Sequence, residues 1–140
     1  MAWIDIVVGE LGSSVRNKIN NLGIFTDALS NSMTLKADKR VPQILKTTSY
    51  ALELTDAFTK QKCLSANNIN ITIPTNSTTN FAVDDEIAII PYGVGLVTII
   101  PTSGVLLNGN NVPIALKGTY KAATLTQIAT NEWLLVGSLI

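Results

Sequence analysis

The sequence predicts a mainly β protein, in which a short N-terminal helical or extended arm precedes an antiparallel β-sandwich or barrel domain. Charged residues make up only 14% of the 140 positions, well under the usual quarter, and Thr, Asn and Ser take their place. The charges are also unevenly distributed. Residues 63–116 carry only the three consecutive acids at 84–86, whereas residues 1–62 mix acids and bases freely. We therefore expect an arm over residues 1–42 and a β-domain over residues 49–140.

The arm opens with "WIDIVVG", an alternation that is typical of a short strand or of an extended peptide added to the edge of a partner's sheet. Ser13 and Ser14 then offer an N-cap to a predicted helix. The apolar residues of this helix follow a short, imperfect heptad spacing: Val15, Ile19, Leu22 and Leu29. The spacing leaves two alternatives open, an amphipathic helix that lies on its own domain and a helix that self-associates.

The β-domain is predicted from short runs of period two that are separated by turn residues. In "NINITIP", for example, Ile69, Ile71 and Ile73 share one face. One parity of "FAVDDEIAIIPY" carries the apolar residues Phe81, Val83, Ile87 and Ile89. The sequence "GVG" predicts a hairpin into "LVTIIP", and "TNE" predicts a last hairpin between "ATLTQIA" and "WLLVGSLI". Many short strands at this spacing are typical of an antiparallel sandwich or barrel.

The residue types argue against catalysis and against bound metals or cofactors. The chain has no histidine, the commonest general base and metal ligand, and a single cysteine, Cys63, which rules out a Cys-based zinc site. The consecutive acids at 84–86 point to alternate faces of a strand, and no serine is tied to a base. We therefore expect no catalytic residues, no metal and no cofactor, and the chain is not expected to be an enzyme.

Nucleic acid and membrane partners are not expected either. The net charge is +0, so the chain has no basic field for phosphates. Residues 87–116 carry no charge, but Pro91, Pro101 and Pro113 break this run into pieces shorter than the roughly 20 apolar residues that a membrane-spanning helix needs. The acids of the N-terminal segment do not fit a secretion signal.

The last segment, "EWLLVGSLI", is apolar on both faces of the predicted strand. One face carries Trp133, Leu135 and Leu139, and the other carries Leu134, Val136 and Ile140. A strand with one wetted face should alternate apolar and polar residues. Both faces of this strand are therefore expected to be covered. The cover could come from a two-layer core of the monomer or from outside the monomer.

Three motifs in the C-terminal half point to a family. They are a Tyr-Gly-x-Gly turn, a Tyr-x-Ala-Ala-Thr-Leu strand and a terminal Asn-Glu-Trp, which match Tyr92, Gly93, Gly95, Tyr120, Ala122, Ala123, Thr124, Leu125, Asn131, Glu132 and Trp133. This part resembles the C-terminal β-domain of bacteriophage and prophage fibre proteins. In the arm, "DIVVGELGSSVRNKINNLG" is similar to N-terminal segments of virion proteins, and "LKADK" is similar to phage-fibre shaft phrases. Typical fibres are far longer, so the shaft would be minimal here.

The resemblance implies a virion structural protein, assembled in the bacterial host cytoplasm as a short homotrimeric fibre or decoration-type component. Its partners would be copies of itself and other capsid or tail proteins. The arm would provide the virion anchor through Trp3, Ile4, Ile6 and Val8. A trimer would also cover the second face of the last strand. The expected trimer interface is Val15, Ile19, Leu22, Leu29, Leu134, Val136 and Ile140.

An alternative from another functional class is a host-receptor or glycan-binding tip domain of a tail fibre. Its contacts with a host cell-surface glycan would come from the loop residues Asn76, Thr78, Asn108 and Asn110. A third class, a capsule-degrading depolymerase, would need two carboxyls that converge across a cleft, and the sequence does not predict such a pair.

Overall fold

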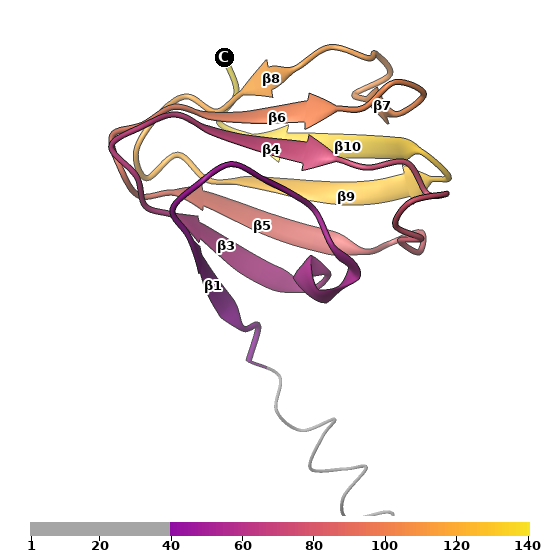
Figure 1. The fold of residues 1–140 in the computed structure, drawn as a ribbon, viewed down its shortest axis with the longest axis horizontal. Helices are drawn as coiled ribbons and strands as arrows, with labels where there is room; N and C mark the ends of the chain where they lie inside the picture. Colours follow the sequence, from indigo (N-terminus) through magenta and orange to yellow (C-terminus); the bar gives the residue numbers. More distant parts are fainter. Residues whose placement is uncertain (1–39) are drawn as a thin grey trace, which may run out of the picture. The chain divides into compact units, whose positions relative to one another are not determined.

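The computed structural model describes residues 40–140, which form two β-sheets and one short 3-10 helix (Figure 1). Sheet A contains, in spatial order, β1 (Gln43–Lys46), β3 (Thr59–Cys63), β5 (Glu86–Pro91), β9 (Ala123–Ala129), β10 (Glu132–Gly137) and β7 (Leu106–Leu107). Sheet B contains β2 (Tyr50–Ala51), β4 (Ile69–Ile73), β6 (Val97–Pro101) and β8 (Ile114–Ala115). The helix η1 (Leu54–Asp56) connects β2 to β3. The prediction of a mainly β domain is confirmed.

The chain alternates between the two sheets from β1 to β6, and this winding makes neighbouring strands parallel. In sheet A, β1, β3 and β5 are parallel neighbours, and in sheet B so are β2, β4 and β6. Parallel neighbours need a crossover connection, and here each crossover is a strand of the other sheet. The predicted purely antiparallel architecture is therefore wrong, because the sheets are mixed. Antiparallel pairs occur only later, between β5 and β9, β9 and β10, and β6 and β8.

The sequence "GVG" does not form the predicted hairpin, because β5 and β6 lie in different sheets. Instead, the β5–β6 connection lies directly against the β3–β4 connection. Gly93 N donates to Cys63 O at 3.0 Å, and Gly95 N donates to Ser65 O at 3.0 Å. A Cβ atom at Gly93 would collide with the backbone of Ser65, and one at Gly95 would collide with the backbone of Asn67. Glycine is needed at both positions for this close approach.

The core lies between the two sheets and follows the predicted alternation. Ile69, Ile71 and Ile73 of β4 are all buried, as the period-two pattern predicts. The largest buried side chain is Trp133, whose ring meets that of Phe81 edge to face at a centroid distance of 5.1 Å. This geometry is the one that aromatic pairs prefer.

The acids before β5 form a turn, so the predicted strand over this segment begins later than expected. Asp84 has a positive φ of 73°, and the Asp85 carboxylate accepts a hydrogen bond from Ala82 N at 2.8 Å. As a result Val83 is exposed, although its parity places it with the core residues Ile87 and Ile89.

The last two strands form the predicted antiparallel hairpin. β10 ends at Gly137, where a Cβ atom would collide with Ala123. The residues after Gly137 then leave sheet A. Leu139 forms a bridge with Leu116, and Ile140 N donates to Ala115 O of sheet B at 2.9 Å. The predicted alternation over "WLLVGSLI" therefore holds only as far as Gly137.

Candidate interaction surface

The side of sheet A that faces away from sheet B is called the outer face below. β10 shows how strongly the two sides of this sheet differ. Trp133 and Leu135 are 0% and 2% exposed, whereas Leu134 and Val136 are 40% and 58% exposed. Trp133 and Leu135 are packed in the core, but no described residue buries Leu134 and Val136 on the outer face. The alternative of a last strand covered on both sides within one monomer is therefore wrong for residues 40–140.

The register of sheet A arranges the outer-face side chains in rows. Two rows of successive Cα partners cross the sheet: Val136, Thr124, Ala88 and Lys60, and beside them Leu134, Thr126 and Glu86. The face is therefore apolar on β10, carries Thr124, Thr126 and the exposed Ile128 on β9, and is charged on β3 and β5. Contiguous exposed apolar surface rimmed by polar residues is typical of an interaction site.

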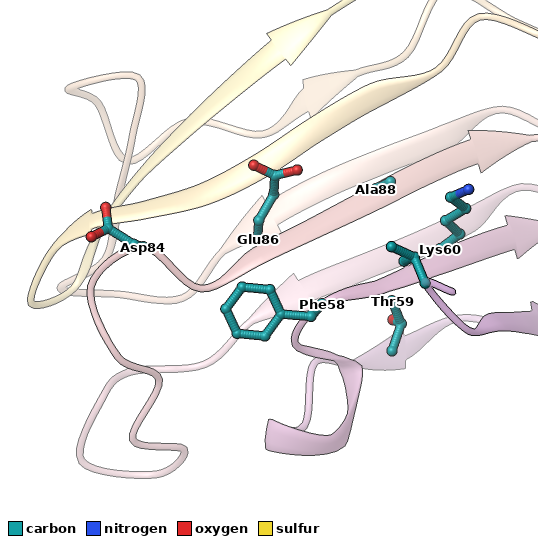
Figure 2. A pocket seen from close by; sticks show the side chains of 7 residues that line it. Phe58, Thr59, Lys60, Asp84, Glu86 and Ala88 are labelled. Carbon is teal, nitrogen blue, oxygen red and sulfur yellow. The ribbon is translucent and has the colours of Figure 1, made fainter. Parts of the chain in front are cut away.

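The charged part of the outer face contains a groove of about 250 Å³. It is lined by Val41, Phe58, Thr59, Lys60, Asp84, Glu86 and Ala88 (Figure 2). Among the described residues, no ion pair joins Lys60 to Asp84 or Glu86; the ion pair between Lys46 and Asp56 lies outside the groove. The groove thus presents unpaired charges of both signs beside an exposed phenyl ring.

Two residues of this groove have a backbone conformation that side chains rarely adopt. Phe58 has φ 56° and Asp84 has φ 73°; aspartate tolerates this region, but a positive φ at a bulky residue such as Phe58 is an outlier. Hydrogen bonds from Phe58 N to Glu86 O at 2.7 Å and from Asp84 N to Gln127 O at 2.9 Å hold the two residues in place. Such strained positions cluster at functional sites.

The predicted site residues divide into two groups. The virion-anchor residues Trp3, Ile4, Ile6 and Val8 and the heptad residues Val15, Ile19, Leu22 and Leu29 lie outside the described residues. Of the others, Leu134 and Val136 lie on the outer face of sheet A. Ile140 is exposed, but its backbone runs along β8 of sheet B, so the structure does not place it in the same row.

Two of the four loop residues of the glycan-binding alternative use their side-chain amides in hydrogen bonds within the domain. The side-chain amide of Asn76 donates to Phe81 O at 2.9 Å, and its oxygen accepts from Gln127 Nε2 at 2.9 Å and from Asn131 N at 3.0 Å. Asn108 bonds both backbone groups of Leu135, at 2.7 Å and 3.1 Å. These amides are therefore not available to a sugar.

The remaining two loop residues, Thr78 and Asn110, make fewer and longer hydrogen bonds within the domain. The Thr78 hydroxyl lies 3.2 Å from that of Thr75, and Asn110 Nδ2 donates to Asn108 O at 3.5 Å. Both side chains lie in connections at the end of the domain where the acids at 84–86 begin β5.

The motif residues behind the resemblance mostly have structural roles. Gly93 and Gly95 allow two connections to touch, Asn131 Oδ1 accepts a hydrogen bond from Asn76 N at 2.6 Å, and Trp133 fills the core. No family model matches this chain, and no curated protein matches it significantly.

Residues 40–140 contain no group of three or more His, Cys, Asp or Glu side chains that could hold a metal ion. Within the same residues, no helix has the length and apolar character needed to cross a membrane.

Proposed function

We propose that the chain is a structural component of a bacteriophage virion, a short homotrimeric fibre or decoration-type protein without enzymatic activity. Its arm, residues 1–42, would bind capsid or tail proteins, and its β-domain would project from the particle. The motifs at Tyr92, Tyr120 and Trp133 support the family, and the outer face of sheet A supports self-association.

The observation that carries the assembly proposal is the exposure of Leu134 and Val136 on a strand whose other side is fully buried. Val136 continues into a row with Thr124 and Ala88, and Leu134 into a row with Thr126 and Glu86, so the apolar side chains of β10 border threonines on the neighbouring strand. In a closed ring of three copies each interface joins two different patches, and Leu134 and Val136 would supply the apolar part of one of them.

The experiment that tests assembly is static light scattering on the full chain and on two matched variants. The wild type should have a mass of about 45 kDa, three times 15.0 kDa. Val136→Asp should give a folded monomer, because it places an unpaired carboxylate in the interface of every copy. Val112→Asp is the control, since Val112 has the same 58% exposure but lies in the β7–β8 connection.

A wild-type mass of 15 kDa would contradict the trimer. A Val136→Asp variant that keeps the wild-type mass would show that copies meet elsewhere. Circular dichroism separates loss of assembly from loss of folding, because a folded monomer keeps its β spectrum.

The alternative of a host-glycan-binding tip is retained as a second proposal, but it needs residues other than Asn76 and Asn108, whose amides are engaged internally. The exposed tyrosines at the opposite end of the domain, Tyr92 and Tyr120, are the observation that favours it.

A further inference from the structure

The two ends of the β-domain differ in charge. One end, here called the tyrosine end, is formed by residues 64–68, 92–96 and 117–122, and it lies where the arrows of β3 and β5 point in Figure 1. These segments contain no side-chain carboxylate, and they hold Lys117 and Lys121. The acids at 84–86 lie at the other end of β5. A chain of zero net charge therefore has a locally positive end, which only the fold creates.

Two exposed tyrosines stand at this end. The rings of Tyr92 and Tyr120 meet edge to face, with a centroid distance of 5.2 Å and an angle of 89°. Tyr92 is 40% exposed and Tyr120 is 70% exposed. Lys62 Nζ lies 3.7 Å from the centroid of the Tyr92 ring, so an ammonium group is part of the same cluster. The perpendicular rings form a corner that is open to solvent.

The backbone holds this corner in a fixed position. Tyr120 has a positive φ of 62°, and its N donates to Pro91 O at 2.8 Å. The Thr119 hydroxyl donates to Gly93 O at 2.8 Å, which ties the turn of residues 118–121 to the β5–β6 connection. The corner is thus preorganised, and preorganised groups lose less entropy when a ligand binds.

A purely structural role explains this arrangement less well. An aromatic residue stabilises a fold mainly by burying its ring, but most of Tyr120 lies in solvent. A left-handed conformation is unfavourable at a residue other than glycine. The chain therefore accepts strain to present a ring to solvent, and strain of this kind is typical of binding sites.

The chemistry of the cluster defines the ligand class. The face of an aromatic ring carries partial negative charge, which attracts the C–H groups on the face of a sugar ring. The ammonium groups of Lys62, Lys117 and Lys121 supply opposite charge for a carboxylate or phosphate on that sugar. We propose that the tyrosine end binds an acidic saccharide, stacked on the Tyr92–Tyr120 corner and paired with these lysines.

Single-stranded nucleic acid fits the cluster less well. Proteins that bind it combine a long basic groove with several stacking rings along the strand. The tyrosine end instead offers one corner and three lysines. The proposal gives the glycan-binding alternative a new site, and it does not depend on the copy-to-copy contact across sheet A.

The test is a titration of the ¹⁵N-labelled full chain, followed by NMR, with four probes. The probes are trigalacturonate, a phosphorylated disaccharide, a neutral trisaccharide and a thymidine oligonucleotide. We expect shifts confined to the tyrosine end with at least one acidic sugar, with a Kd of about 1 mM or below, and none with the neutral sugar. Which acidic sugar binds more tightly distinguishes a carboxylate source from a phosphate source.

Variants assign the contacts. Tyr120→Ala should weaken binding about tenfold or more, because it removes one of the two rings on which the sugar stacks, whereas Tyr120→Phe should bind like the wild type. Lys117→Gln and Lys121→Gln should weaken binding and reduce its dependence on salt. A well-dispersed spectrum of each variant shows that it is folded.

Three results would overturn the proposal. The first is no shift at the tyrosine end with either acidic sugar. The second is equal binding of the neutral sugar, which would remove the role of the lysines. The third is preferential binding of the oligonucleotide with unchanged affinity in Tyr120→Ala, which would indicate only nonspecific attraction of polyanions. Because the titration works on a monomer or a trimer, failure here is distinguishable from failure of the assembly proposal.

Discussion

At the scale of single residues, a buried carboxylate of the β-domain is paired with a partly exposed lysine. Lys46 Nζ lies 3.2 Å from Asp56 Oδ1, and Asp56 is only 2% exposed. The same carboxylate accepts hydrogen bonds from Glu53 N at 2.9 Å and from Gln61 Nε2 at 3.0 Å. A buried charge is tolerated when it is paired and hydrogen-bonded in this way.

The single thiol lies close to this pair and gives a prediction about pH. Burial raises the pKa of Cys63 to about 11, although the ammonium of Lys46 acts in the opposite direction. The thiol should therefore be protonated and unreactive toward iodoacetamide at about pH 8 in the folded chain, and it should react rapidly once urea unfolds the chain. Fast labelling of the folded protein would contradict the burial of Cys63.

The same shift links stability to pH. The folded pKa of Cys63 lies above the ordinary value of 9.0, so its contribution to stability is complete below pH 9 and is lost as the pH rises through about 11. The loss should be about 2–3 kcal/mol in urea unfolding. Burial also raises the pKa of Tyr50, which adds a loss in the same direction at higher pH. Cys63→Ala should reduce the dependence of the unfolding free energy on pH between 9.0 and about 11.

At the scale of elements, two connections determine how the chain winds. The β3–β4 and β5–β6 connections touch because Gly93 and Gly95 have no side chains. The contact is fixed by Gly95 N to Ser65 O and by Leu96 N to Asn68 Oδ1, both at 3.0 Å. The β5–β6 connection thus packs directly on the β3–β4 connection. Repeat proteins, whose units contact only their neighbours, show the same kind of packing.

This contact predicts that Gly95→Ala is strongly destabilising. Its Cβ would collide with the backbone carbonyl of Asn67, so the connections would separate and lose their hydrogen bonds. We expect a loss of about 3 kcal/mol or more in urea unfolding. Gly104→Ala is the control: nothing lies within 4 Å of its Cβ position, and its positive φ alone should cost about 1–2 kcal/mol. Equal losses would contradict the steric account.

At the scale of the whole molecule, the domain begins earlier than the sequence predicts. β1 starts at Gln43 and pairs with β3 along its whole length, whereas the β-domain was expected from Ser49. Residues 43–46 supply an edge strand, and they supply Lys46, the partner of the buried Asp56.

The boundary predicts opposite outcomes for two truncated chains. A chain that starts at Val41 should fold with the stability of the full β-domain, and under the proposed function it should no longer join phage particles. A chain that starts at Ser49 should lose about 3–5 kcal/mol, because it leaves Asp56 as an uncompensated buried charge. Urea unfolding followed by circular dichroism measures the stability of both truncated chains.

A Ser49 chain as stable as the Val41 chain would show that β1 is dispensable. Retention of the Val41 chain on particles would show that the arm is not the anchor.

The sequence alone determined which side chains enter the core along the strands that it predicts correctly. The alternation at Ile69, Ile71 and Ile73 and that at Trp133 and Leu135 both appear in the structure, as does the last hairpin. Side-chain alternation is a property of the extended backbone itself, so it can be recognised without knowing the neighbouring strand. For the same reason Leu134 and Val136 could be separated from the core residues of their strand.

Only the tertiary structure decided which strands are neighbours, and with them the surfaces. Pairing depends on residues far apart in the chain, so "GVG" could not be distinguished from a hairpin turn by its local sequence. The positive φ of Phe58 accompanies a hydrogen bond to β5, and no residue preference signals it. The internal role of Asn108 and the meeting of Tyr92 with Tyr120 likewise arise from long-range contacts. Local periodicity determines which way a side chain points, but the winding of the whole chain determines what it meets.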